Sequence, residues 1–130
     1  MNFRDSLPIY LQIAERLMDE IVAGQYKTDE RVPGVRDYSV LLQVNVNTTT
    51  KAFDQLRQRG IIYDRRGMGS YVSAEAREII LSQRREDFLN TQIPALARTM
   101  LQLSISPEQL TQHLSQHLSQ TTDQNLPTTP

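Results

Sequence analysis

Polar side chains crowd into one short stretch of the sequence, at Asn45, Asn47, Thr48, Thr50 and Lys51. Amides and hydroxyls hydrogen-bond to base edges and phosphates, and a lysine ammonium pairs with a phosphate. Asparagine and threonine are weak formers of helix interiors, but they are favoured at a helix start, where they bind unpaired backbone N–H groups. The stretch therefore predicts the first turn of a helix whose polar side chains suit the major groove of DNA.

The residues that follow supply a face that can hold this helix in place. Four of them recur at the spacing i, i+3, i+4, i+7 and can pack inward together: Thr49, Ala52, Phe53 and Leu56. On this phase Asn47 and most of its polar neighbours point away from the core. Gly60 marks the end of the helix.

Two more helices are predicted before this one. Pro8 is suited to start the first, and Gly24 to end it. In the connector that follows, residues 30–32 are expected to pair briefly with a later strand. A shorter helix over residues 35–42 then leads through a turn into the polar stretch. Two helices joined in this way predict a helix-turn-helix.

A β-hairpin is predicted directly after the helix-turn-helix. Two short apolar runs flank the turn Gly67-x-Gly69, with Arg65 and Arg66 at the tip. Paired arginines on a hairpin also serve as a solvated edge that discourages aggregation. Beside a helix-turn-helix we favour a wing whose basic tip contacts the minor groove or phosphates. The turn lacks the third glycine, the following helix and the lysine of a phosphate-binding loop.

The whole-chain composition sets wider limits. A chain of 130 residues with 38% hydrophobic residues suits one domain or two small modules with a modest core. The absence of cysteine excludes disulfides and thiolate metal sites. No apolar run is long enough for a signal peptide or a membrane span, so a soluble, cytoplasmic protein without membrane association is expected.

Charge is distributed unevenly along the chain. The net charge is −1, which by itself does not indicate a nucleic-acid binder. Residues 45–70, however, hold five basic residues against two acidic ones, whereas residues 73–130 hold four against six. The positive excess therefore lies on the predicted DNA-binding segment, which is the polar helix and the hairpin after it.

The composition changes after the hairpin. We predict a DNA-binding domain over residues 1–73, a helical dimerisation region over 74–120 and a disordered tail over 121–130. Helices are expected over 74–89, from Pro94 onwards, and after a capping box formed by residues 106–109. Their apolar residues are expected at a dimer interface, namely Ile79, Ile80, Phe88, Leu89, Leu96, Met100, Leu103, Leu110 and Leu114. The alternative is that these helices fold back on their own chain.

Neither a metal site nor a catalytic site is predicted. His113 and His117 are spaced i, i+4 and can share a helix face, but a third ligand is lacking, since Glu108 lies at the wrong end of that helix. Ser70 has no histidine or acid at a spacing that would activate it as a nucleophile. We therefore expect no metal, no cofactor and no enzyme.

A series of motifs runs in order along residues 8–72: Pro8-Ile9-Tyr10-x-Gln12-Ile13, Gly24, Val32-Pro33-x-Val35-Arg36, Val44-x-x-Asn47-Thr48, Ala52-Phe53-x-x-Leu56, Gly60 and Arg66-Gly67-x-Gly69-x-x-Val72. In these motifs, residues 8–72 resemble the DNA-binding domain of the GntR family of bacterial transcription regulators. The resemblance implies a winged helix-turn-helix homodimer bound to an inverted repeat. It also implies DNA contacts from Arg36, from Asn45, Asn47, Thr48 and Thr50, and from Arg66, Gly67 and Gly69.

The sequence departs from the family pattern at a few positions. Val46 stands where the family often has an arginine, and Thr49 replaces an apolar residue. Asp29 and Gln43 replace glycines that are common in the two turns. The region after the hairpin is too short for the large effector domains of most members, and it resembles the short helical region of the YtrA-like branch, whose members typically regulate transporter operons.

These observations predict a mainly α fold with a small β-hairpin wing. They also predict a homodimeric repressor that binds a palindromic operator in double-stranded DNA and controls a transporter operon. One alternative, favoured by the low net charge and by Val46, is a winged-helix module that binds proteins and not DNA. Another is a ligand-gated regulator with a small-molecule pocket between the C-terminal helices.

Overall fold

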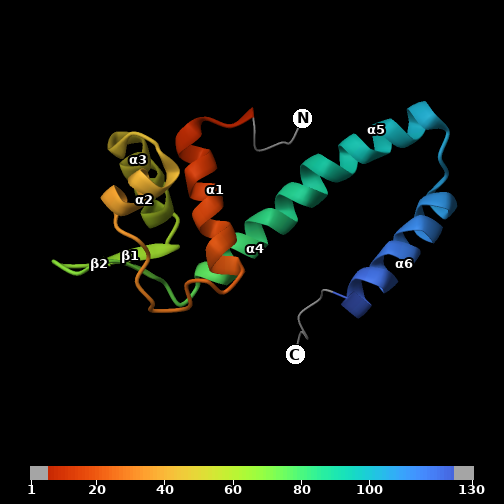
Figure 1. The fold of residues 1–130 in the computed structure, drawn as a ribbon. Coiled ribbons are helices and arrows are strands. Elements are labelled where there is room, and N and C mark those ends of the chain that lie inside the picture. Colours follow the sequence, from red (N-terminus) through yellow and green to blue (C-terminus); the bar gives the residue numbers. More distant parts are fainter. Residues whose placement is uncertain (1–5, 125–130) are drawn as a thin grey trace. The chain divides into compact units, whose positions relative to one another are not determined.

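The computed structural model describes residues 6–124, with side chains described to residue 121. The elements in chain order are α1 (Ile9–Val22), α2 (Val35–Leu42), α3 (Val46–Gln58), β1 (Ile62–Arg65), β2 (Gly69–Val72), α4 (Ala76–Asp87), the π-helix η2 (Phe88–Gln92), α5 (Ile93–Leu103) and α6 (Pro107–Gln124) (Figure 1). The fold is mainly helical with one two-stranded hairpin, as predicted. The chain divides into two compact units after Glu86.

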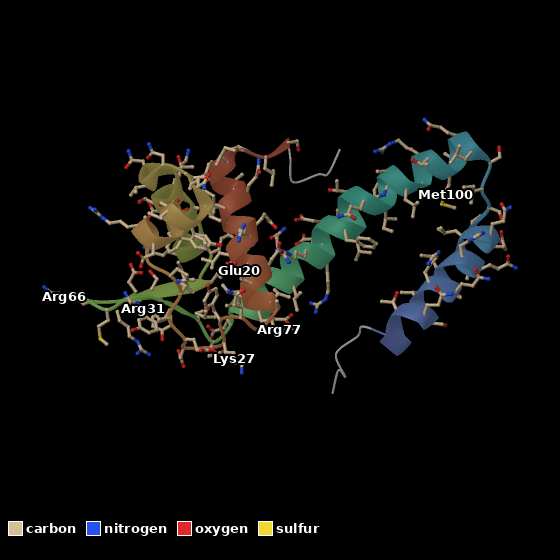
Figure 2. All side chains as sticks on the ribbon, in the orientation of Figure 1. Glu20, Lys27, Arg31, Arg66, Arg77 and Met100 are labelled. Carbon is tan, nitrogen blue, oxygen red and sulfur yellow. The ribbon has the colours of Figure 1, made fainter. Side chains whose placement is uncertain are left out.

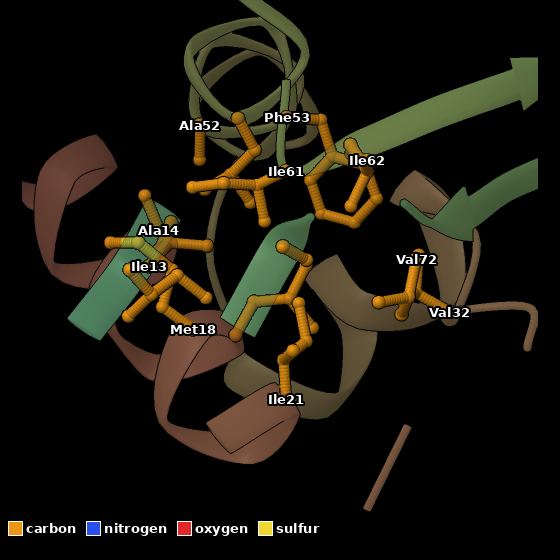
Figure 3. Packing of buried hydrophobic residues seen from close by; sticks show 14 of the residues in the cluster. Ile13, Ala14, Met18, Ile21, Val32, Ala52, Phe53, Ile61, Ile62 and Val72 are labelled. Atoms are coloured by element: carbon orange, nitrogen blue, oxygen red, sulfur yellow. The ribbon is translucent and has the colours of Figure 1, made fainter. Parts of the chain in front are cut away.

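The core of the first unit lies between the four helices α1 to α4 and the base of the hairpin (Figure 3). Both α1 and α3 turn one apolar face inward, and the inward face of α3 consists of the four residues predicted: Thr49, Ala52, Phe53 and Leu56. From α2, Tyr38 packs with its ring centre 6.0 Å from that of Phe53 and donates its hydroxyl proton to Glu20, 2.7 Å away. Burial and the Glu20 carboxylate raise the pKa of Tyr38, so this donor stays protonated.

The hairpin pairs β1 with β2 in antiparallel register from Ile62 opposite Val72 to Arg65 opposite Gly69. The expected pairing of residues 30–32 is confirmed, since Arg31 forms a bridge with Tyr71. Backbone hydrogen bonds on either side of this bridge join the connector to the outer edge of β2. The connector therefore fixes the hairpin to the helical part of the first unit.

The first compact unit extends beyond the boundary predicted at residue 73, because α4 packs on its core. Ile80 is fully buried there, and Ala76 is buried beside it. The Arg84 guanidinium lies 3.1 Å from Glu15 and 2.7 Å from Asp19, both on α1. The prediction that Ile80 lies at a dimer interface is therefore wrong, and Ile79 also packs partly against this core.

The second unit differs from expectation at Pro94, which does not open a separate helix. The π-helix and α5 follow α4 without a loop, and Pro94 is the second residue of α5. A proline cannot donate to the carbonyl four residues earlier and its ring crowds that carbonyl, here that of Asn90. The π-helical turn η2 covers Asn90, and its wider spacing accommodates the proline within a continuous run of helix.

The capping box before α6 is confirmed. The Gln109 amide oxygen accepts from the Ser106 backbone N–H at 2.9 Å, and the Ser106 hydroxyl oxygen accepts from the Gln109 N–H at 3.1 Å. The tail predicted as disordered over 121–130 is helical as far as Gln124, and residues 125–130 lie outside the described residues.

Candidate nucleic-acid interface

The polar stretch singled out in the sequence forms the start of α3. Asn45 caps the helix in an extended conformation (φ −65°, ψ 138°), and its Oδ1 accepts from the backbone N–H of Asn47 at 2.7 Å. The side chains of Asn45, Asn47 and Thr50 are exposed, while Thr48 is half-buried. The helix therefore presents amide and hydroxyl groups on one face while its opposite face lies in the core.

Lys51 is held by an aromatic ring from α1. Its ammonium nitrogen lies 4.1 Å from the centre of the Tyr10 ring, a cation–π geometry. The Tyr10 ring restricts the position of the ammonium group. Lys51 is exposed, and its charge is not neutralised by the ring. Arg36, in the first turn of α2, is also exposed, and α2 packs directly on α3.

The hairpin carries the arginines expected at its tip. The Arg65 guanidinium lies 4.2 Å from the Tyr71 ring centre and donates to the Tyr63 hydroxyl at 3.1 Å. Arg66 lies at the far end of the hairpin (Figure 2). Gly67 and Gly69 both have positive φ, 73° and 95°, a conformation in which a glycine avoids strain.

Arg31 is a basic residue of the wing that sequence reasoning missed. Its guanidinium lies against Gly69, where an added Cβ would come within 2.8 Å of the Arg31 Nε. Figure 2 labels Arg31 beside the hairpin. The expected pairing of residues 30–32 predicts that the Arg31 backbone lies beside the hairpin. It does not predict the position of the Arg31 side chain. Gly69 therefore leaves room for a third arginine beside the two at the tip.

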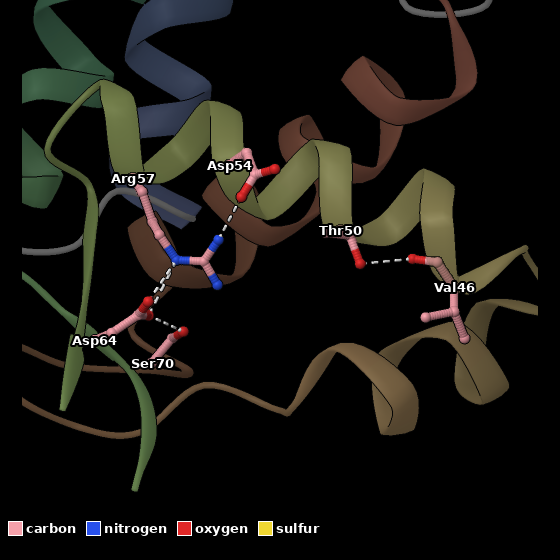
Figure 4. Close-up of polar contacts among 6 residues, drawn as sticks. All are labelled: Val46, Thr50, Asp54, Arg57, Asp64 and Ser70. Atoms are coloured by element: carbon pink, nitrogen blue, oxygen red, sulfur yellow. Dashed lines mark hydrogen bonds and ion pairs between the residues drawn. The ribbon is translucent and has the colours of Figure 1, made fainter. Parts of the chain in front are cut away.

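An ion-pair network attaches the wing to α3 (Figure 4). Arg57 bonds Asp54 at 2.7 Å on its own helix and Asp64 on β1 at 2.9 Å. Ser70 on β2 donates to Asp64 at 2.6 Å. The Ser70 hydroxyl, together with the Arg57 guanidinium, lowers the pKa of Asp64, so this carboxyl stays charged at neutral pH.

A basic hollow of about 380 Å³ lies between the wing and the start of α2. Its lining holds three arginines and one acidic residue, together with Val35, three glycines and Ser70; the charged residues are Arg57, Asp64, Arg65 and Arg66. Guanidinium groups bind phosphate oxygens in a fixed fork geometry. Because Arg57 is already paired with Asp54 and Asp64, the charges that a phosphate could use in this hollow are those of Arg65 and Arg66 on the wing.

The second unit exposes most of its apolar side chains. Among its described residues, 87–121, no side chain is buried. Of the residues expected at a dimer interface, Leu96, Met100 and Leu110 are half-buried, whereas Phe88, Leu89, Leu103 and Leu114 are exposed. The helices η2, α5 and α6 thus leave an apolar surface without a partner inside this unit.

The part of the chain that the structure describes contains neither a metal-binding cluster nor a membrane-spanning helix. No three histidine, cysteine, aspartate or glutamate side chains gather there closely enough to hold a metal, and His113 and His117 are exposed on α6. None of the described helices combines the length and apolar character needed to cross a membrane.

Comparison with known proteins agrees with this geometry. Residues 9–72 match the bacterial regulatory proteins of the gntR family. The HTH-type transcriptional repressor YtrA of Bacillus subtilis (strain 168) is 35% identical over 78 residues, which are 60% of this chain and 60% of YtrA. The structure of a GntR family transcriptional regulator from Listeria monocytogenes is 31% identical, with a TM-score of 0.68 over 86% of this chain and 96% of that one.

A further solved structure contains DNA. It is the DNA-binding domain of AraR in complex with operator ORX1, which is 26% identical, with a TM-score of 0.51 over 55% of this chain and 87% of that one. The family match covers the helix-turn-helix and the hairpin, and the Listeria structure, which covers 86% of this chain, extends the likeness beyond the hairpin. The chain therefore belongs to the GntR family of bacterial regulatory proteins.

Proposed function

We propose that the protein is a transcriptional repressor that binds an inverted-repeat operator in double-stranded DNA as a homodimer. The observation that carries the proposal is the start of α3, where exposed Asn45, Asn47 and Thr50 stand on a helix whose other face is buried. In this arrangement α3 enters the major groove, Arg36 reads or orients on the same groove, and Lys51 contacts a phosphate. Arg65 and Arg66 contact the backbone or the minor groove from the wing.

Two relatives support the DNA-binding part of the proposal. YtrA is named a transcriptional repressor, and the AraR domain was solved on an operator. The family match over residues 9–72 covers the segment that contains α3 and the wing. Control of a transporter operon is part of the proposal because the short C-terminal region resembles the YtrA-like branch.

The homodimer is supported by the exposed apolar side chains of the second unit. Helices that bury none of their described side chains gain stability by packing against another surface. Two-fold symmetry is the commonest way to supply that surface, because each copy covers the same face of the other. A two-fold protein then requires two half-sites in inverted orientation.

The proposal is tested by selecting bound duplexes from a random DNA pool and titrating the binding with salt. We expect an enriched inverted repeat, and an affinity that falls linearly on a log–log plot against salt concentration as counterions are released. A pool without enrichment, together with affinity that is insensitive to salt, would instead favour the protein-binding module. An enriched single half-site would retain DNA binding and refute the two-fold arrangement.

A further inference from the structure

An apolar side chain stands in the middle of the polar tip of α3. Val46 is the first residue of the helix, lies between Asn45 and Asn47, and is 42% exposed. Its neighbours present amides on either side. An exposed valine can neither donate nor accept a hydrogen bond through its side chain, so it has nothing to offer a base edge except apolar contact.

Thr50 lies one turn further along the same exposed face. Residues spaced i, i+4 on a helix are neighbours, and both side chains are exposed. The Thr50 hydroxyl donates its proton to the Val46 carbonyl oxygen, 2.9 Å away (Figure 4). The donor of this threonine is therefore already used within the helix, which leaves its methyl group and an oxygen lone pair for a ligand.

We propose that Val46 and Thr50 read thymine by contact with its C5-methyl group in the major groove. The inference rests on the proposed function, because it requires α3 to lie in that groove. The thymine methyl is the one apolar group among the base-edge features of the major groove, and small apolar side chains contact it. Val46 and Thr50 thus make the preferred half-site require thymine at one or two positions, next to the base that Asn47 reads.

The size of the effect follows from the apolar surface that is covered. Removing one methyl from a buried contact corresponds to about 0.8 kcal/mol, or about a fourfold change in dissociation constant for each contacted methyl. A palindromic site contains each contact twice. Replacing the critical thymine in both half-sites should therefore weaken binding by about sixteenfold, the square of the single-site factor.

The test replaces each thymine of the selected operator in turn by deoxyuridine, which removes only the methyl group. For the wild-type protein we expect about a fourfold loss at one or two thymines of each half-site and no change at the others. Val46→Ser should bind the thymine and deoxyuridine operators equally well at the position that Val46 contacts. Val40→Ser is the matched control, since Val40 is 79% exposed on α2 and should leave the discrimination intact.

Thr50 provides a second, independent pair of variants. Thr50→Val keeps the methyl and loses the hydroxyl, so it should retain the preference for thymine. Thr50→Ser keeps the hydroxyl and loses the methyl, so it should lose the preference at its own position. If the order of these two variants is reversed, Thr50 reads the base through its hydroxyl and its part of the proposal is wrong.

The outcomes separate this inference from the proposed function. An enriched operator in which no thymine can be distinguished from deoxyuridine overturns the inference and leaves DNA binding in place. Full discrimination in Val46→Ser overturns the role of Val46. A pool from which no duplex is enriched overturns the proposed function and this inference together.

Discussion

Asn45 and Asn47 are both exposed asparagines at the start of α3, but their side chains differ in the hydrogen bonds that they make. The Asn45 Oδ1 accepts the backbone N–H of Asn47 and so completes the helix cap. The exposed Asn47 side chain takes no part in that cap. An asparagine with both amide atoms available pairs with the N6 and N7 edge of adenine. Asn47 is therefore the better candidate for reading a base, and Asn45 for stabilising the helix that presents it.

Alanine substitutions should separate these two roles. Asn45→Ala should lower the free energy of unfolding by about 1 kcal/mol, because the cap is lost. Asn47→Ala should leave stability unchanged, cost about 1–3 kcal/mol of operator binding and relax the preference at one position. Denaturant unfolding and binding to a panel of single-base operator variants measure the two effects. Unchanged affinity and preference in Asn47→Ala would show that the reading tip is misplaced.

Lys51 should act on phosphates, which carry no sequence information. Lys51→Ala is expected to weaken binding to all duplexes alike and to reduce the slope of log affinity against log salt by about one. Because the Tyr10 ring holds the ammonium, Tyr10→Leu should weaken binding without changing that slope. Tyr10→Phe keeps the ring and serves as the control. A changed base preference in Lys51→Ala would instead assign the lysine to a base.

At the scale of elements, the position of the wing depends on an ion-pair network, and its turn depends on the backbone conformation of its glycines. The network of Arg57, Asp64 and Ser70 joins it to α3, and the pKa of Asp64 is lowered by these partners. A carboxyl with a lowered pKa in the folded state contributes stability above its ordinary pKa of about 4, and this contribution is lost as the pH falls through the lowered value.

Asp64→Asn should therefore be less stable than wild type at neutral pH, and the difference should disappear in acid. Thermal unfolding across a pH series measures this. In Ser70→Ala the pKa of Asp64, followed by NMR of its carboxyl carbon, should rise towards the usual value, because the Ser70 hydrogen bond is its largest stabilising cause. A stability difference that persists unchanged at low pH would mean that the charge of Asp64 does not hold the wing.

The two glycines of the wing provide a matched pair of substitutions. Both have positive φ, so alanine at either position should cost about 1–3 kcal/mol of stability. Only at Gly69 would the new Cβ also meet Arg31, since nothing lies within 4 Å of the corresponding position at Gly67. Gly69→Ala should thus reduce operator affinity more than Gly67→Ala does. Equal losses would argue against a role for Arg31 in the wing.

Local signals predicted most elements of the fold. The bounds of α2 and the capping box of α6 agree with the structure, because side chains and backbone groups a few residues apart determine them. Pro94 was misread because a proline that opens a helix and one that follows a π-helical turn have the same sequence signature. Asp29 and Gln43 adopt positive φ at turns where the family pattern has glycine, which only the backbone geometry reveals.

Packing partners were harder to predict than elements. The apolar spacing of residues 76–81 correctly indicated a helix with a buried face, but periodicity does not say which surface covers that face. Ile80 was therefore assigned to a dimer interface although it lies in the core of the first unit. Arg31 was missed because the expected pairing of residues 30–32 places its backbone beside the hairpin but does not say that its side chain lies against Gly69.

At the scale of the whole molecule, the two units differ in how far their apolar side chains are buried. The first unit has a continuous core from α1 to α4. The second leaves side chains such as Phe88, Leu101 and Leu118 exposed. The net charge of −1 gives no general attraction to DNA, so the proposed affinity relies on the local basic groups and, in the proposed dimer, on two DNA-binding domains that bind at once. Operator binding should consequently depend on the second unit even though it contributes no proposed base contact.

The dependence can be tested by placing a charge on the apolar surface of α6. Leu114→Glu should weaken self-association by more than about tenfold, corresponding to about 1.4 kcal/mol, because a carboxylate would be buried at the proposed interface. Gln116→Glu adds the same charge two residues away on the same helix and should leave the dimer intact.

Sedimentation equilibrium gives the dissociation constants of the dimers. Binding to the full inverted repeat and to a single half-site shows how a weaker dimer changes operator affinity. Leu114→Glu should retain binding to the half-site, since α3 and the wing belong to the other unit, and lose most of its advantage on the full repeat. If both variants stay dimeric and bind the full repeat equally, the DNA-binding domains of the two subunits are joined through some other surface.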